Sequence, residues 1–112
     1  MNLDKLMPPV TGSESFRKSR ESFIPDVAGC YVLATFKGEV LYIGLATRLR
    51  RRVAQHLDNP GKTVLTPMGR AVMVHWRMAD ELEVLERTWL LTHEQHEGRL
   101  PILNRVHSPV SV

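Results

Sequence analysis

The chain has 112 residues, 43% of them hydrophobic, and a formal net charge of +3 at pH 7. These values are typical of one globular domain and exclude wholesale disorder. No apolar run approaches the ~20 residues that cross a bilayer, the N-terminal MNLDKLMPPVTGSES has no secretory pattern, and the single cysteine, Cys30, excludes an internal disulfide. We therefore expect a cytoplasmic protein that does not contact a membrane.

The first half of the chain predicts an arm followed by a hairpin. Residues 1–25 lack clear periodicity and carry several basic side chains, so we interpret them as an N-terminal basic arm, with a short helix expected over 13–22. A domain over 26–112 follows the arm. Its segments 29–36 and 39–44 are rich in β-branched and aromatic residues, which predicts two strands. Lys37-Gly38 between them predicts a tight antiparallel turn.

The second half predicts two helices around a third strand. Thr47 is the expected N-cap of a helix over 47–57, in which apolar residues recur every four positions. Residues 58–61 end that helix, a loop follows over 62–71, and 71–77 predicts a strand. Asp80 opens a helix that extends to about Gln95. We therefore predict an α+β domain with a small three-stranded antiparallel sheet flanked by helices.

Charge is distributed unevenly along the domain. Residues 48–52 hold four arginines, and residues 80–97 hold six acidic residues, which suggests that the two segments have different roles. At about 100° per residue, Arg51 points away from the apolar face of the first helix. Arg52 and His56, four residues apart, lie together at the border of that face. They are either a pair of side chains at the edge of the core or members of a site.

Glu86 lies inside the apolar stripe of the second helix, between Leu82 and Leu90. A carboxylate aimed at a core costs several kcal/mol unless it is paired or binds a metal. Two interpretations stay open, namely a salt bridge to an arginine of the first helix and a functional site. His93 shares the stripe, and a lone histidine there is more typical of a structural group than of a ligand.

Tyr31 and Tyr42 lie on the two strands of the hairpin. With a two-residue turn, Leu33 pairs with Tyr42 and Tyr31 pairs with Gly44, which puts both tyrosines on one face of the sheet. A three-residue turn separates them onto opposite faces unless a bulge corrects the register.

Several short motifs now occur in order. Gly29-Cys30-Tyr31 and Tyr42-Ile43-Gly44 resemble the paired motifs of the GIY-YIG nuclease superfamily. In that family a catalytic arginine follows the second tyrosine by ten residues, which matches Arg52, and a histidine or tyrosine follows four residues later, which matches His56. The family's helical glutamate matches Glu86, and its Pro-x-x-Asn matches residues 101–104. The resemblance covers about residues 27–106, with departures at Leu45, Arg48 and the insertion around Gly98.

The resemblance implies a GIY-YIG-like fold and a metal-dependent endonuclease acting on DNA in repair or recombination. Glu86 would bind one Mg²⁺ or Mn²⁺, hard ions that prefer carboxylate and water ligands. Arg52 would contact the scissile phosphate. Tyr31 would be the general base, with His56 as the alternative proton acceptor. Tyr42 and His56 would orient water or phosphate, and Asn104 would hold the backbone or a water network of the site.

Contact with DNA is expected to come mainly from charge, which fixes position without reading sequence. The candidate residues are Arg48, Arg50, Lys62 and Arg70, together with the basic arm. Because no second recognition domain is evident, we expect structure-directed or weakly specific cutting, or a protein partner or self-association that supplies specificity. The alternative function is a non-catalytic nucleic-acid-binding module that has kept the fold.

Overall fold

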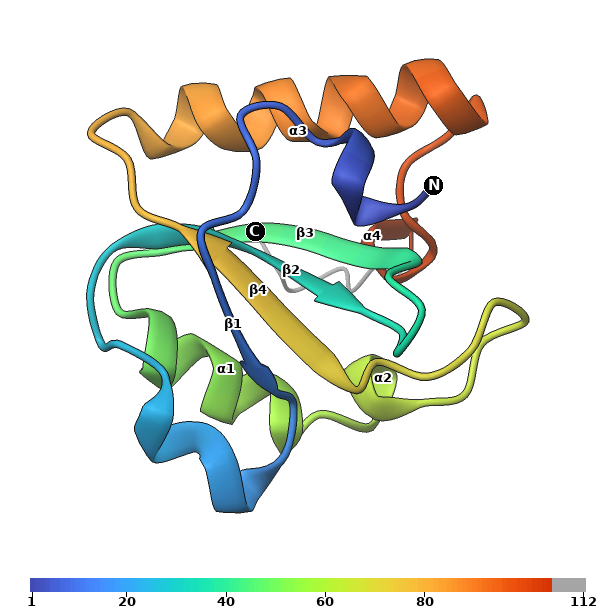
Figure 1. Cartoon of the computed structure of the whole chain (residues 1–112). Helices are drawn as coiled ribbons and strands as arrows, with labels where there is room; N and C mark the ends of the chain where they lie inside the picture. Colours follow the sequence, from blue (N-terminus) through green and yellow to red (C-terminus); the bar gives the residue numbers. More distant parts are fainter. Residues whose placement is uncertain (106–112) are drawn as a thin grey trace.

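The computed structural model describes residues 1–105 of the chain. An antiparallel sheet of four strands lies between two layers of helices (Figure 1), with strand order β1-β4-β2-β3. The strands are β1 (Gly12–Ser15), β2 (Gly29–Ala34), β3 (Val40–Ala46) and β4 (Met73–Arg77). The predicted α+β class is confirmed, and the sheet has one strand more than the three predicted. No helix within the described range is long and apolar enough to cross a membrane.

The helices cover the two faces of the sheet unequally. The long helix α3 (Leu82–Glu97) and the short 3₁₀ helix η1 (Leu3–Lys5) lie over one face. The other face carries α1 (Leu49–Leu57), α2 (Pro60–Thr63) and the 3₁₀ helix η2 (Lys18–Phe23), while α4 (Ile102–Arg105) contacts the edge strand β3. Two apolar clusters result, one around Trp89 under α3 and one around Leu49 and Val53 under α1.

The additional strand β1 comes from the segment that was expected to be an arm. It pairs with β4 over its whole length, from Gly12 opposite Trp76 to Ser15 opposite Met73. The side chains of Leu6, Phe16 and Ile24 are buried. The first 25 residues therefore belong to the sheet and its cores, and β1 with η2 replaces the helix expected over 13–22. The reason is tertiary, since the sequence GSES has no strand pattern of its own and forms a strand on the open edge of β4.

The β2–β3 hairpin combines a three-residue turn with a bulge. Thr35 and Glu39 close the turn, with Thr35 N donating to Glu39 O (3.0 Å) and Gly38 N donating to Thr35 O (3.0 Å). Gly38 has φ +92°, which favours glycine. The register shifts between Leu33 and Ala34, so Tyr31 still pairs with Gly44, and Leu33 with Tyr42. The bulge corrects the register of the three-residue turn and places both tyrosines on the same face of the sheet, which was one of the two arrangements expected.

Helix α1 begins two residues later than predicted. Arg48 occupies the N-cap position without a side-chain cap, so the predicted Thr47 cap is wrong. Asp26 takes over part of that role, because its Oδ1 accepts a hydrogen bond from the backbone N–H of Arg51 (3.3 Å). At the other end of the fold, α3 terminates at Gly98, whose φ of +77° gives the left-handed C-cap that glycine favours.

Candidate active site

Three side chains meet on the α1 face of the sheet. The Tyr31 hydroxyl lies 2.5 Å from Nε2 of His56 and forms a hydrogen bond with it. The ring of Tyr42 lies 5.9 Å from that of Tyr31 and 5.2 Å from that of His56, measured between centroids. The hairpin supplies the two phenols and α1 supplies the imidazole, so the fold brings together three residues that the sequence singled out.

Gly44 makes room for this cluster. A Cβ atom at Gly44 would lie 2.8 Å from the Tyr31 hydroxyl oxygen and 2.8 Å from a ring carbon of Tyr42. Any other residue would push the two phenols apart or displace β3. The glycine is therefore required by the close approach of the tyrosines.

The two phenols differ in their access to solvent. Tyr31 has no exposed surface, whereas Tyr42 is half-buried. Burial raises the pKa of Tyr31 well above its usual value, and Tyr42 adds to that effect. Burial also raises the pKa of Tyr42, but the interaction with Tyr31 and the positive charge of Arg52 oppose the change. Tyr42 is thus the phenol with exposed surface, and Tyr31 is the phenol hydrogen-bonded to the buried imidazole.

His56 is held in its neutral form. Burial, followed by the positive charges of Lys62 and Arg52, lowers its pKa to about 4. A neutral imidazole at physiological pH has one ring nitrogen free to accept a proton. His56 can therefore accept the hydrogen bond of the Tyr31 hydroxyl and remain an acceptor over the whole neutral range.

This low pKa predicts how stability depends on pH. The folded-state pKa of about 4 lies below the model value of 6.5, so the unfolded state binds the proton more readily and stability falls as pH drops from about 6.5 to about 4. We expect a loss of about 2 kcal/mol between pH 7.5 and pH 5 from this group. Urea unfolding at both pH values measures it.

His75 and His93, whose pKa values are also lowered, contribute to the pH dependence in the same direction. The variant His56→Gln therefore serves as the comparison, since it should lose the part of the dependence that His56 causes. Equal pH dependence in wild type and variant would mean that His56 titrates normally in the folded protein.

Arg52 belongs to the same helix as His56, and its guanidinium is available to bind an anion. It is exposed, it precedes His56 by one helical turn, and its charge lowers the pKa of Tyr31, Tyr42 and His56. Within residues 1–105 its guanidinium enters no ion pair. It lines a surface pocket of about 210 Å³. The other residues lining that pocket are Ala46, Thr47, Arg48, Arg51 and Gln55.

Arg51 is a member of this pocket that the sequence did not indicate. The helical wheel correctly turned it away from the core, but the C-terminal end of β3 folds back beside α1 and makes a hollow there. The four arginines of residues 48–52 do not by themselves indicate a pocket, because its other wall comes from the end of β3.

Glu86 belongs to α3, in the other helical layer, yet its charge affects the pKa values of the two tyrosines. Its negative charge contributes to raising the pKa of both Tyr31 and Tyr42. Burial, followed by the charge of Glu83, raises the pKa of Glu86 itself. Among residues 1–105 no arginine of α1 forms a salt bridge with it. A half-buried carboxylate without a cationic partner is suited to bind a cation.

Asn104 fixes the edge strand that carries Tyr42. Its Oδ1 accepts a hydrogen bond from Ile43 N (2.9 Å), and its Nδ2 donates to Ile43 O (2.9 Å). The side-chain amide thus pairs with β3 as a neighbouring strand would. Asn104 therefore binds the backbone of Ile43, the residue that follows Tyr42 in β3.

Lys62 lies closer to the cluster than its prediction as a DNA contact implied. Its Nζ is 4.7 Å from the centroid of the Tyr42 ring and donates to Leu103 O (3.3 Å). Partial burial lowers its pKa. The short helix α2 begins at Pro60, inside the segment expected to end the first helix, and it carries Lys62 over Tyr42.

The remaining predicted DNA contacts are spread over the surface. Arg48 forms an ion pair with Asp26 (2.6 Å), and Nε of Arg50 donates to Ile24 O (2.7 Å). Arg70 is exposed in the loop before β4, near the hairpin turn rather than the cluster. The fold therefore leaves Arg51 and Arg52 freer than Arg48 and Arg50 to bind an anion.

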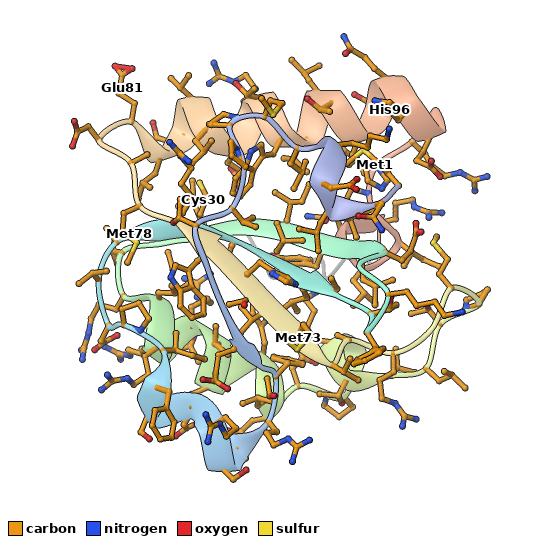
Figure 2. All side chains as sticks on the ribbon, in the orientation of Figure 1. Met1, Cys30, Met73, Met78, Glu81 and His96 are labelled. Atoms are coloured by element: carbon orange, nitrogen blue, oxygen red, sulfur yellow. The ribbon has the colours of Figure 1, made fainter. Side chains whose placement is uncertain are left out.

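Two titratable residues on the opposite face are structural. His93 is buried, and its Nδ1 hydrogen-bonds to Arg99 O (2.8 Å), as expected for a satisfied core histidine. Cys30 points from the sheet toward α3 (Figure 2), and its Sγ donates to Leu82 O (3.2 Å). Burial raises the pKa of its thiol to about 12, which makes it unreactive.

The chemistry of the donor groups limits which metal this site could hold. Within the described residues, no three histidine, cysteine, aspartate or glutamate side chains gather as a metal site. A cation at Glu86 would have one protein carboxylate and would complete its shell with water and phosphate oxygens. Mg²⁺ and Mn²⁺ accept such a shell, whereas a structural zinc site requires several protein ligands.

Part of the chain is similar to a known bacterial protein. No protein-family model matches the chain. The chain is 33% identical over 81 residues to the UvrABC system protein C of Prochlorococcus marinus (strain MIT 9312). The aligned region covers 72% of this chain and 12% of that protein, so the chain corresponds in length to a small part of this relative.

Proposed function

We propose that the chain is a nuclease domain of the GIY-YIG type that hydrolyses phosphodiester bonds in DNA with one Mg²⁺ or Mn²⁺. The observation that carries the proposal is the cluster of Tyr31, Tyr42 and His56, whose electrostatics are influenced by Arg52 and by Glu86. The similarity to a UvrABC system protein C is consistent with that superfamily.

The phosphate would be held from the α1 side. Arg52 offers a planar guanidinium that can bridge two phosphate oxygens, and Arg51 lines the same pocket. Lys62, on the other side of Tyr42, offers a second positive charge. A scissile phosphate between Arg52 and Lys62 would lie against the half-buried Tyr42 hydroxyl.

The proton of the attacking water would leave through the hydroxyl groups. Tyr42, which has exposed surface, would meet the water and pass a proton to Tyr31, whose hydroxyl is hydrogen-bonded to neutral His56. The proton would end on the imidazole, so neither phenol has to be ionised beforehand. The charge of the bound phosphate would have to raise the pKa of His56 from about 4 for the imidazole to hold it. This path unites the two expected proton acceptors, Tyr31 and His56, in one chain of groups.

Glu86 would hold the metal ion, which when bound neutralises charge on the phosphate and on the leaving 3′-oxygen. Burial is the largest cause of the raised pKa of Glu86 and of both tyrosines, and nearby negative charge adds to it. A divalent cation would favour the ionised form of Glu86, so binding of the ion suits the electrostatics of this carboxylate.

Arg52→Ala tests the phosphate contact. We expect a fall in the cleavage rate of about a hundredfold or more, because the residue would stabilise charge that develops on the phosphoryl oxygens. Arg87→Ala is the matched control, since Arg87 is exposed on α3, on the other face of the sheet. Nicking of supercoiled plasmid in Mg²⁺ and in Mn²⁺ measures both variants.

The same assay distinguishes the enzyme from the non-catalytic binding module. The enzyme nicks the plasmid as wild type and as Arg87→Ala but not as Arg52→Ala. Equal nicking by all three proteins would indicate a contaminating nuclease and reject the assignment. DNA binding without cleavage, whatever the metal and the substrate shape, would favour the binding module.

A further inference from the structure

Apolar side chains are exposed together at the turn end of the hairpin. Phe36 in the β2–β3 turn is 88% exposed, and Leu65 in the neighbouring loop is 65% exposed. Val64 and Met68 add to them, with Lys37 and Arg70 at the margin. We call these six residues the tip surface. Large apolar groups in such number on an exposed turn are typical of a binding surface.

Hydrogen bonds close the loop that carries Met68, and this loop packs against the hairpin turn. Thr66 and Gly69 exchange two backbone hydrogen bonds of 3.0 Å each, and the Thr66 hydroxyl donates to Gly69 O (2.7 Å) and accepts from Met68 N (3.1 Å). A Cβ atom at Gly69 would lie 2.9 Å from the methyl carbon of Thr35, so the loop packs on the base of the hairpin turn. Met68 and Lys37 line one shallow pocket of about 350 Å³. The loop of Met68 and the hairpin turn therefore form one continuous surface.

The charged residues of the tip surface are basic. Lys37 and Arg70 belong to it, Lys62 belongs to the preceding helix α2, and residues 59–79 contain no acidic residue. The acid next to the hairpin turn, Glu39, is bound to the amino group of Met1. A polyanion with exposed flat apolar groups complements such a surface, whereas a purely apolar partner would leave the lysines and the arginine unmatched.

The tip surface lies within reach of DNA bound at the cluster. Phe36 follows Leu33, the residue opposite Tyr42, by three positions, which corresponds to about 10 Å along a strand. Consecutive phosphates of one DNA strand are spaced by about 3.4 Å along the helix axis. Phe36 would therefore meet DNA about three nucleotides from a phosphate at Tyr42, the residue over whose ring Lys62 lies.

We propose that the tip surface binds unpaired DNA bases a few nucleotides from the cut, with Phe36 as the ring on which a base stacks and Leu65 as a further apolar contact. The proposal rests on the proposed function and names its substrate class, namely DNA that has an unpaired segment next to a duplex. Sites for single strands combine positive charge with aromatic stacking groups. An intact duplex keeps its bases stacked on one another and offers Phe36 no such contact.

Binding to matched DNA molecules tests the proposal independently of cleavage. The probes are a fluorescent 30-mer duplex and the same duplex with a four-nucleotide unpaired segment, measured by anisotropy in EDTA. Wild type should bind the unpaired probe more tightly. Phe36→Ser combined with Leu65→Ser should reduce that preference about tenfold or more and leave duplex affinity unchanged. Leu91→Ser, which changes an exposed apolar residue of α3, should behave as wild type.

Three results would overturn the inference. These are the absence of a preference in the wild type, a preference that survives the double substitution, and an equal loss of affinity for both probes. If the double variant also converts a dimer to a monomer in sedimentation without changing the preference, the tip surface is a contact between copies. Cleavage in Mg²⁺ without any preference for unpaired DNA would reject this inference and keep the nuclease, whereas preferential binding without cleavage would do the reverse.

Discussion

Replacement of Glu86 by glutamine is expected to reduce the rate of DNA cleavage by about a thousandfold or more, with binding of DNA retained. Glutamine keeps the size of the side chain and removes the charge that would hold the metal ion. Single-turnover cleavage of a labelled oligonucleotide in Mg²⁺ measures the rate, and anisotropy in EDTA measures binding. The loss should persist at high Mg²⁺, because the described residues offer no other carboxylate cluster for the ion.

The same substitution should not destabilise the fold. The pKa of Glu86 is raised in the folded state, so its ionised form opposes folding at neutral pH and its effect on stability becomes less favourable as pH rises. Glutamine removes that cost, and the thermal midpoint at pH 7.5 should be equal to or higher than that of wild type. Glu83→Gln, an exposed change on the same helix, is the control. Wild-type cleavage by Glu86→Gln would remove Glu86 from the site.

Tyr31→Phe is expected to lower the cleavage rate by about a hundredfold or more, because it removes the hydroxyl in the middle of the proton path. The aromatic ring that packs in the core is kept. The buried Nε2 of His56 loses its partner, which should cost about 1–2 kcal/mol of folding free energy. The rate is measured at a temperature where the variant is fully folded, as judged from its own unfolding curve.

His93→Gln separates the two effects of that substitution. His93 is also buried and hydrogen-bonded, but it belongs to α3 and contacts Arg99 O rather than a tyrosine. It should lose stability to a similar degree and keep the rate of the wild type. A rate for Tyr31→Phe within a few-fold of wild type would mean that Tyr31 is an ordinary strand aromatic and that the proton leaves by another route.

The two tyrosines show which features of the site can be predicted from the sequence and which cannot. Alternation along strands limited Tyr31 and Tyr42 to two arrangements, and the choice between them depended on a bulge at Leu33 and Ala34. The bulge accompanies the three-residue turn closed by Thr35 and Glu39. The residue types around Lys37-Gly38 do not determine whether the turn has two or three residues. The pattern therefore found both residues, and only the fold could show that one is closed to solvent.

Glu86 and the first 25 residues show the two kinds of tertiary information that a sequence lacks. The position of Glu86 within an apolar stripe predicted that it needs a partner, but not that its field reaches both phenols from the other layer of the fold. Gly12–Ser15 has no strand pattern and becomes β1 because β4 offers an open edge. In both cases the neighbour that matters is distant in sequence.

Lys62 and Asp26 were missed or placed differently for a local reason. A four-residue helix such as α2 contains too few residues for a helical period, so the place of Lys62 over Tyr42 could not be predicted. Asp26 precedes β2 by three residues and caps α1 across space, which leaves no motif around Thr47 or Arg48.

The most direct test of the account is cleavage by the purified wild-type protein of labelled duplex, nicked, flapped and branched DNA, in Mg²⁺, in Mn²⁺ and in EDTA. The account predicts cuts in the presence of either metal and none in EDTA. The new ends should carry a 5′-phosphate and a 3′-hydroxyl, which DNA ligase can rejoin. Binding of these DNAs without cleavage in either metal, or cleavage that EDTA leaves unchanged, would contradict it.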